Sequence, residues 1–276
     1  MASKQNPNNP TYFPFNKLKD LLHSEKIVCV LGYGLSEGYA PHYYDIQHGA
    51  WSSVEKALLL KPFSNQQHFE MVLNWFNWRR AGTKTKESIM AFNEISLLRT
   101  CFNISVGTQN VDGLHRINNL DNIYELYGCV LDTRSIRNEN LDLQDVEKQS
   151  DEMQKYADKR LDDSQTDQRQ LPDVDMFGWN SKANARADFL KVAIEAELII
   201  KIGSDDFLSP FSEMNINNKK PSLKITSDCI EFILDSHLYK LPLVKIEEHL
   251  NDAVEGIKIP VKTIADVIKY LYTIYR

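Results

Sequence analysis

The sequence predicts an α/β fold built around a parallel β-sheet. Three short, apolar, β-rich runs each end in glycine or polar residues, which is typical of buried parallel strands followed by tight turns. These runs are Lys26–Gly34, Phe102–Asn110 and Ala196–Asp206. Segments with apolar residues at helical spacing lie between and after them, and strands that alternate with helices indicate a parallel sheet.

Each run justifies its assignment in turn. The first, "KIVCVLGYG", ends in a Gly-x-Gly turn; the second, "FNISVGTQN", ends in hydrogen-bonding side chains; the third, "AELIIKIGSDD", ends in Gly203-Ser204. Pro221–Asp228 and Leu241–Glu248 are weaker strand candidates. Helices are predicted for "SIMAFNEISLLR", "RADFLKVAIEAE" and "TIADVIKYLYTIY". Because parallel sheets bind ligands at the carboxyl ends of their strands, we expect a ligand site where the polar strand ends meet.

Two regions interrupt this alternation. Gly49–Thr100 has a helix-like pattern, and Phe69, Leu73 and Phe76 fall on one helical face. Asn138–Gln170 is polar and charged over most of its length and lacks the apolar stripe of a packed helix. A solvated helix or a partly disordered insertion is the interpretation that this composition favours.

Composition excludes several classes of protein. The chain of 276 residues is 42% hydrophobic, which is enough for a substantial core. Its net charge of −6 makes direct nucleic-acid binding unlikely, because domains that bind nucleic acid usually carry an excess of basic residues. We expect no membrane span, because no apolar run approaches the required length of about 20 residues. The four cysteines form no C-x-x-C pair, so we expect free thiols and an intracellular protein, cytoplasmic or nuclear.

The segment from Thr108 to His115 reads "TQNVDGLH" and carries the strongest functional signal. It resembles the sirtuin signature T-Q-N-I-D-G-L-H. Further segments resemble sirtuin motifs in the expected order, and together they cover most of the chain from about residue 26 to residue 211: "VCVLGYGLS", "YELYGCVLDTRS", "LPDVDMFGW" and "LIIKIGSDDFLSPF".

This resemblance implies a Rossmann-like NAD-binding domain with helices on both faces of its sheet, and a small, mostly helical domain formed by two insertions. The implied divisions are a flexible arm at 1–20, the NAD-binding domain at 21–48, 101–137 and 171–276, and the small domain at 49–100 and 138–170. It also implies that NAD or ADP-ribose is the cofactor, and that NAD releases nicotinamide while an acyl-lysine oxygen bonds the anomeric carbon of the ribose. The implied cofactor-binding residues are Gly32, Tyr33, Gly34, Gln109, Asn110, Asp112, Gly203 and Ser204.

Four departures from the family pattern bear on activity. Tyr127 stands where the family has its catalytic His, and a phenol with an ordinary pKa near 10 is a poorer base than an imidazole by about 4 kcal/mol at neutral pH. Tyr33 replaces an Ala between the two glycines, and "GYAPHYY" lacks the family's Asp and Arg. "GSDD" adds negative charge beside the expected pyrophosphate, and the zinc cysteines are missing, so no metal is predicted.

Three hypotheses follow. The favoured one is a divergent sirtuin that has lost deacylase activity wholly or largely, keeps a weak nucleotide pocket, and acts as a binding or assembly module. Its protein partner would dock on the small domain or the N-terminal arm. The second is an active NAD-consuming enzyme, namely a glycohydrolase, an ADP-ribosyl transferase or a divergent deacylase, in which Gln109, Asn110 and Asp112 activate the nicotinamide ribose without the His. The third retains the motif for folding and binds a different ligand or none.

Overall fold

The computed structural model describes residues 13–40, 75–83, 89–137, 142–145, 168–175, 183–204, 220–253 and 262–276. Within these ranges, residues 75–82 are helical. The other helices are α1 (Phe15–Leu22), the short η1 (Tyr33–Leu35), α4 (Met90–Cys101), α5 (Leu114–Ile117), α7 (Ala183–Glu195), α8 (Leu243–Ala253) and α9 (Ile264–Tyr275). The strands are β1 (Ile27–Leu31), β2 (Ile104–Thr108), β3 (Tyr124–Glu125), β4 (Gly128–Arg137), β5 (Asp142–Asp145), β6 (Gln168–Val174), β7 (Leu198–Ile202), β8 (Ser222–Ile225), β9 (Cys229–Leu234) and β10 (His237–Pro242).

A seven-stranded sheet forms the body of the described chain, in the order β10-β9-β8-β7-β1-β2-β3. The five strands from β8 to β3 are parallel to one another, whereas β9 pairs antiparallel with both β8 and β10. Every residue of β1 and of β7 is buried, as expected for central strands covered on both faces. The predicted α/β fold with a mainly parallel sheet is confirmed.

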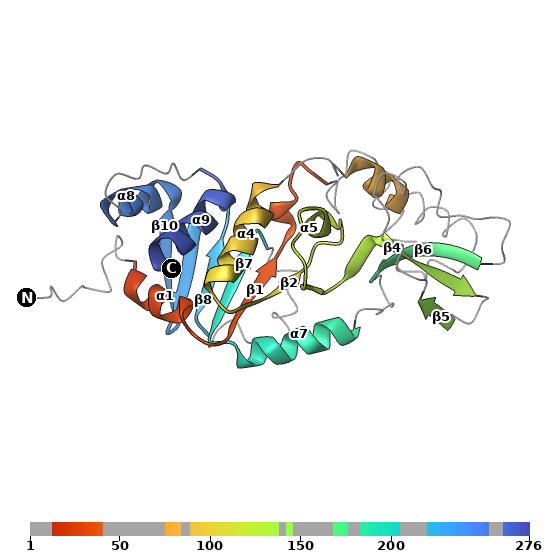
Figure 1. Cartoon of the computed structure of the whole chain (residues 1–276), viewed down its shortest axis with the longest axis horizontal. Helices are drawn as coiled ribbons and strands as arrows, with labels where there is room; N and C mark the ends of the chain where they lie inside the picture. The colour runs from red at the N-terminus through yellow and green to blue at the C-terminus, as the bar shows by residue number, and fades with distance from the viewer. Residues whose placement is uncertain are drawn as a thin grey trace, which may run out of the picture.

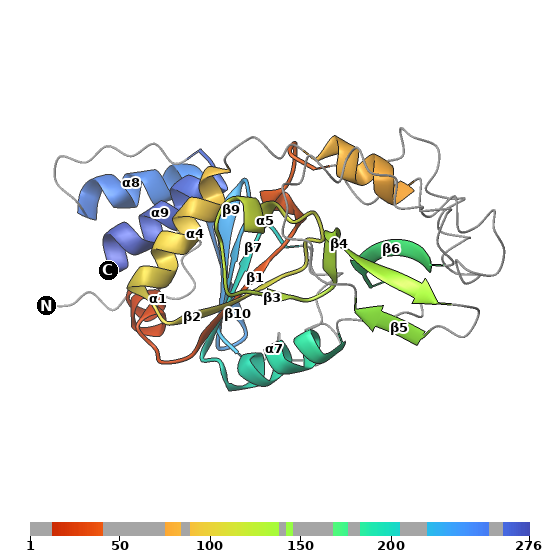
Figure 2. The ribbon, with the colours of Figure 1, turned by 45° about the vertical axis from the view of Figure 1, so that its right-hand side comes forward.

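Helices cover both faces of this sheet, as Figure 2 shows: α4, α8 and α9 lie on one side and α7 on the other. Side chains alternate along β1, so that Ile27, Cys29 and Leu31 face the larger core under α4 and α9, while Val28 and Val30 face α7. An unbroken apolar strand therefore contributes to two cores at once, which explains why its sequence shows no polar alternation.

A second sheet lies beyond one end of the main sheet (Figure 1) and has the order β5-β4-β6, with both pairs antiparallel. It was not predicted. Gly128–Arg137 and Leu171–Val174, which the sequence assigned to the NAD-binding domain, belong to it. Residues 142–145 and 168–170 are strands as well, not the expected solvated helix or disordered insertion; the rest of Asn138–Gln170 lies outside the described residues.

Two boundaries differ from the sequence predictions. Residues 15–20, expected to belong to a flexible arm, form part of α1, because Leu18 and Leu22 recur at helical spacing and are fully buried. Leu241–Glu248 was predicted as a strand, but only its first two residues end β10 and the remainder begins α8. Ile246 is buried on this helix, so the apolar spacing there has the helical period.

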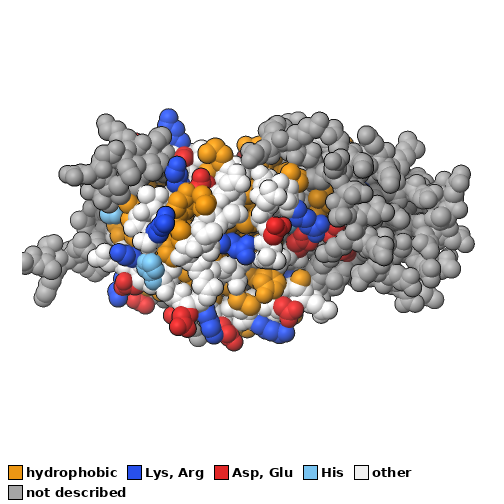
Figure 3. Space-filling view, viewed as in Figure 1, with side chains coloured by type: hydrophobic (Ala, Val, Ile, Leu, Met, Phe, Trp, Pro, Cys, Tyr) orange, Lys and Arg blue, Asp and Glu red, His pale blue; other side chains and the backbone are white. Residues whose placement is uncertain are grey.

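The face seen in Figure 3 carries acidic and basic side chains interspersed. Two exposed ion pairs illustrate the mixture: Lys26 with Glu195 and Lys191 with Asp188, each at 2.8 Å between nitrogen and oxygen. Such a mixture differs from the basic stripe of a nucleic-acid-binding face. Among the described residues, no helix is long and apolar enough to cross a membrane.

Candidate functional site

The candidate site lies where the chain changes direction across the main sheet. From β1 the chain proceeds to β2 and β3 on one side, whereas β7 and β8 lie on the other side of β1. The point between the carboxyl ends of β1 and β7 is therefore a topological switch point, which is the place where open α/β sheets bind nucleotides. The polar segments that follow β1, β2 and β7 all begin at this edge.

The glycine turns after β1 and β7 touch each other through their backbones. The amide of Gly34 donates to the carbonyl of Gly203 at 2.8 Å, and the amide of Gly32 donates to Ile202 at 3.0 Å. A Cβ on Gly32 would meet the Cα of Ser204 at 2.2 Å. Both glycines are thus required for close approach of the two turns, and their N–H groups bind protein carbonyls, so they would not donate to a phosphate group.

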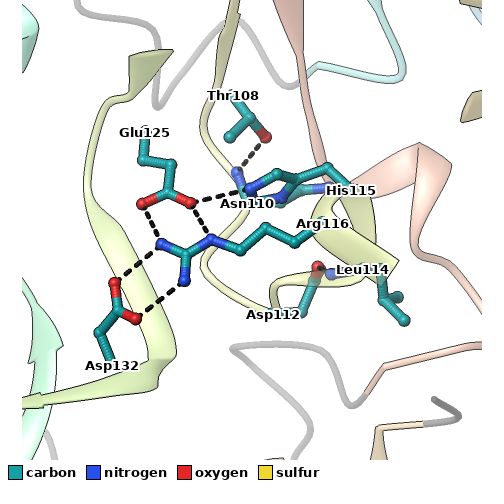
Figure 4. A network of polar contacts seen from close by, with 8 residues as sticks. All are labelled: Thr108, Asn110, Asp112, Leu114, His115, Arg116, Glu125 and Asp132. Carbon is teal, nitrogen blue, oxygen red and sulfur yellow. Dashed lines mark hydrogen bonds and ion pairs between the residues drawn. The ribbon is translucent and has the colours of Figure 1, made fainter. Parts of the chain in front are cut away.

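Asn110 connects the end of β2 to the glycine turn. Its side-chain amide donates to the carbonyl of Gly32 at 3.0 Å and to the Oγ of Ser36 at 2.8 Å, and the residue is only 7% exposed. Its backbone amide donates to the hydroxyl of Thr108 (Figure 4). The amide of Gln109 donates to the carbonyl of Leu31 at 2.8 Å. These bonds place Asn110 at the switch point and fix which way its carboxamide faces.

Asp112 has a visible role in the turn that follows. Its Oδ1 accepts a hydrogen bond from the amide of Leu114 at 2.9 Å, at the start of α5 (Figure 4). Gly113 between them has a φ of 77°, a left-handed conformation that glycine adopts without strain. Asp112 therefore stabilises the turn by an Asx-type hydrogen bond, and this role does not require a ligand.

Tyr127 lies alongside Gln109 and Asn110. The segment that carries it follows β3, and two hydrogen bonds align it with the end of β2: Leu126 N to Thr108 O at 3.0 Å and Val130 N to Val111 O at 2.7 Å. Its half-buried ring packs against the core on the α7 side of the sheet. The guanidinium of Arg186, on α7, lies over this ring at 5.3 Å from the centroid.

The hydroxyl of Tyr33 is held by its own loop. It donates to the carbonyl of Ala40 at 2.9 Å, and the residue is half-buried. The sequence raised the question of whether this ring points away from the crevice or fills part of it. The hydrogen bond gives the hydroxyl a partner within the loop that follows the glycine turn, so a ligand is not needed to satisfy it.

Ser204 presents a contrast to these residues. It is 6% exposed, and its hydroxyl is buried without a hydrogen-bond partner in the described structure. A buried, unpaired hydroxyl costs on the order of 1–3 kcal/mol, so most native structures avoid one. Ser204 follows Gly203 at the end of β7, and its Cα lies beside Gly32 in the glycine turn of β1. Among the described residues, the Nδ1 of the buried His115 is likewise without a hydrogen-bond partner, so Ser204 is one of several such groups.

A partly buried charge network that the sequence did not predict lies next to the motif (Figure 4). Arg116 contacts Glu125 through Nε at 2.5 Å and Nη2 at 2.6 Å, and it contacts Asp132 through Nη1 and Nη2, both at 2.8 Å. The Nε2 of His115 bonds Glu125 at 2.9 Å. Arg116 and Glu125 are nine residues apart in the sequence, a spacing that matches neither a helix nor a strand. Only the fold brings them together.

Electrostatics in this network follow from burial and pairing. Burial alone would raise the pKa of Glu125, but hydrogen bonds from His115 and Arg116 and the charge of Arg116 outweigh it and lower the pKa to about 2. Burial raises the pKa of the neighbouring Cys129 thiol to about 12. Glu125 is therefore a permanent anion at neutral pH, and Cys129 is a neutral thiol without nucleophilic character.

Several predicted features lie outside the described residues. These are Asp205 and Asp206, the loop after Ala40, and residues 146–167, where the family has its zinc module. In the described part of the chain, no three His, Cys, Asp or Glu side chains are grouped so as to hold a metal ion. The structure brings the glycine turns, Asn110, Ser204 and the Tyr127 segment to one edge of the sheet.

Comparison with known proteins gives a consistent result. The family model described as the Sir2 family matches residues 32–210 of this chain. An NAD-dependent protein deacylase 1 of Caldanaerobacter subterraneus subsp. tengcongensis is 24% identical over 72% of this chain and 81% of its own length. An NAD-dependent protein deacylase of Helicobacter pylori strain 26695 is 26% identical over 72% of this chain and 82% of its own length.

A shorter match is to an NAD-dependent protein deacylase of Ralstonia nicotianae, 30% identical over 38% of this chain and 43% of that relative. The chain thus matches less than half the length of this relative. Among solved structures, a Sir2 homolog–NAD complex has a TM-score of 0.57 at 20% identity, over 79% of this chain and 84% of that one. A Sir2 His-to-Tyr mutant with a p53 peptide and NAD has a TM-score of 0.54 at 20% identity, over 78% and 87%.

Proposed function

Because the chain belongs to the Sir2 family, we propose that it binds NAD or ADP-ribose in the crevice at the carboxyl ends of β1, β7 and β2. We propose further that its deacylase activity is lost or strongly impaired and that it acts as a binding or assembly module. The observation that carries the second part is the position of Tyr127, whose ring packs against the α7-side core under Arg186.

The residues present fit a dinucleotide at the switch point. The unpaired hydroxyl of Ser204 would take the phosphate or adenosine side, and Asn110, with Gln109 and Asp112, would take the nicotinamide side. The glycine turns would contribute close backbone approach. Bound NAD supplies a ribose whose bond to nicotinamide can break; this chain's residues orient that ribose and exclude water from it.

The chemistry that follows in the family requires a base, and Tyr127 is poorly suited to that role. An ordinary phenol titrates near 10, so at neutral pH it is a weaker proton acceptor than an imidazole by about 4 kcal/mol. A cation over the ring face, as Arg186 provides, engages the aromatic ring by a cation–π contact and keeps it on the α7 side. Tyr127 therefore serves as a wall of the site and as a hydrogen-bonding group at most.

The alternative is an active NAD-consuming enzyme: a glycohydrolase, an ADP-ribosyl transferase or a divergent deacylase. The observation in its favour is the order of the Asn110 side chain, whose two donors are both engaged at the switch point. A fixed carboxamide beside the ribose would stabilise a cation-like centre by position alone, without a base. Several relatives are named NAD-dependent protein deacylases, which supports keeping this alternative.

Titration calorimetry with NAD and ADP-ribose, followed by chromatography for free nicotinamide, separates these proposals. Binding without nicotinamide release at high protein concentration, with and without an acetyl-lysine peptide, supports the binding module. Release that disappears in Asn110→Ala establishes the alternative. If neither nucleotide gives heat, both fail, and the motif is retained for folding alone.

The substitution Tyr127→His tests whether the missing base is the main defect. We expect it to raise NAD cleavage above wild type, because an imidazole beside Asn110 would accept a proton at neutral pH. Tyr127→Phe is the matched control, since it keeps the ring under Arg186 and adds no base. If the His variant binds NAD but stays as inactive as the Phe variant, the defect lies elsewhere, in Tyr33 or the altered loop after the glycine turn.

The same module would hold a protein partner through the small domain or the N-terminal arm. Support for a peptide-class partner comes from the solved Sir2 mutant with a p53 peptide and NAD. Cross-linking of the NAD-loaded protein, compared with a variant lacking residues 1–12, would test the arm; equal cross-linking by both would assign the partner to the small domain.

A further inference from the structure

We propose that Arg186 is a positioning residue that fixes Tyr127 as the wall of the nicotinamide-side ribose subsite, and that it thereby sets affinity for ligands that carry that ribose. The juxtaposition of this guanidinium with the Tyr127 ring and the end of β6 carries the inference. This inference rests on the proposed nucleotide site. It assigns to Arg186, a residue outside the motif, an effect on the binding of the second ribose.

Arg186 holds the Tyr127 segment by three different contacts. Its Nη1 donates to the carbonyl of Leu126 at 2.8 Å, it forms an ion pair with Asp175, and its guanidinium covers the ring of Tyr127. The side chains of Arg186 and Asp175 are only 14% and 9% exposed, so the pair is shielded from water. The amide of Asp175 also donates to the carbonyl of Tyr127 at 2.8 Å, which closes a ring of contacts between α7, β6 and this segment.

The backbone on both sides of Tyr127 is fixed independently. Two residues earlier, Glu125 is held by Arg116 through two hydrogen bonds. One residue later, Gly128 has a φ of 87°, and a Cβ there would lie 2.0 Å from the carbonyl oxygen of Asp173. With the backbone held in this way, the ring of Tyr127 packs against the α7-side core, and the guanidinium of Arg186 lies over it at 5.3 Å from the centroid.

The proposed placement of the dinucleotide, with its phosphate and adenosine side at Ser204, decides which part of the ligand meets this ring. Tyr127 lies beside Gln109 and Asn110 at the β2–β3 end of the crevice, whereas Ser204 lies on the other side of β1, after β7. A dinucleotide whose diphosphate lies at the switch point extends to both sides. Adenosine and the diphosphate would occupy the β7 side, so only a ligand with the second ribose would reach Tyr127.

Calorimetry with ADP, ADP-ribose and NAD on wild type and Arg186→Met tests the proposal, because ADP lacks the second ribose. We expect unchanged affinity for ADP and affinity for ADP-ribose and NAD weakened about tenfold, which corresponds to loss of a partly desolvated cation–π contact. Arg186→Lys keeps the charge without the planar fork and should recover part of the loss. The control Lys191→Met removes an exposed cation from the same helix and should leave all three affinities unchanged.

Equal weakening for all three ligands, or no weakening for any, overturns the proposal, since a merely destabilised protein would not distinguish ADP from ADP-ribose. If wild type binds none of the three, the nucleotide site itself is refuted and the inference fails with it. Should Arg186→Met not fold, Tyr127→Leu removes the wall while leaving the Arg186–Asp175 pair in place. The same ribose-selective loss is then required, and its absence also overturns the inference.

Discussion

Replacing Glu125 by Gln should lower stability at neutral pH and leave it unchanged in strong acid. Glu125 accepts hydrogen bonds from His115 and from two nitrogens of Arg116, and its side chain is 15% exposed. Gln is nearly isosteric but keeps one acceptor oxygen and places an NH₂ group against the guanidinium. The substitution therefore removes the partly buried anion, and the NH₂ group of Gln corresponds to the O–H donor that Glu125 itself carries once it is protonated in acid.

The magnitude follows from the pKa of the carboxyl. Hydrogen bonds from His115 and Arg116 overcome the opposing effect of burial and lower this pKa from 4.5 to about 2, which corresponds to about 3 kcal/mol of folding free energy. Because the folded pKa lies below the unfolded one, the full contribution is present above about pH 5. It decreases as the pH falls from 4.5 towards 2, where the carboxyl protonates in the folded state, and below that range it is absent.

Urea denaturation followed by circular dichroism from pH 7 to pH 2 measures this difference. We expect wild type to lose stability faster than Glu125→Gln as the pH falls, so that the gap closes from about 3 kcal/mol towards zero. Glu195→Gln is the matched control: it removes one carboxylate from an exposed ion pair with Lys26, which should contribute little. Parallel stability profiles for wild type and Glu125→Gln would refute the reasoning, because the gap would then not depend on the ionised carboxyl.

Two further substitutions test the crevice. Asn110→Asp should lower the free energy of unfolding by about 1–3 kcal/mol and weaken NAD binding, because an oxygen replaces the nitrogen that donates to Gly32 and Ser36. Chemical denaturation measures the first effect and calorimetry the second. Unchanged stability and unchanged NAD affinity would contradict the hydrogen bonds assigned to Asn110. Gly203→Ala should lower the free energy of unfolding by about 1–3 kcal/mol, because Gly203 has a φ of 57° and a Cβ there would lie 2.9 Å from the amide nitrogen of Leu35. An unchanged melting temperature would contradict this close packing.

The sheet, and the edge at which its polar strand ends meet, could be predicted because their signals are local. β1 and β7 are short apolar runs followed by glycine, and a parallel sheet places such endings together. The same reasoning located Asn110 and Gly203, which the structure brings to one crevice. Burial on both faces produces an unbroken apolar run, and this is a strong pattern even in a single sequence.

The second sheet and the charge network could not be found in this way. β4 reads "GCVLDTRSIR" and β6 reads "QRQLPDV", and both mix polar and apolar residues without a clear period. Arg116 is an ordinary charged residue in the sequence, and only the approach of β3 and β4 gives it Glu125 and Asp132 as partners. Long-range pairing of this kind depends on topology, which residue types do not encode locally.

The contacts at the switch point show that the positions of Asn110 and Asp112 are explained by their role in folding, whereas the unpaired hydroxyl of Ser204 is not. Both donors of the Asn110 side chain bind protein groups, and Asp112 accepts a hydrogen bond from the start of α5, so each would be retained for the sake of the turns alone. Ser204 differs, because its buried hydroxyl has no partner in the described structure and lowers stability as it stands. A ligand at the switch point would pair this hydroxyl, which supports the proposal of nucleotide binding. The case for nucleotide binding therefore depends more on Ser204 than on the motif itself, whereas the case for lost chemistry depends on Tyr127.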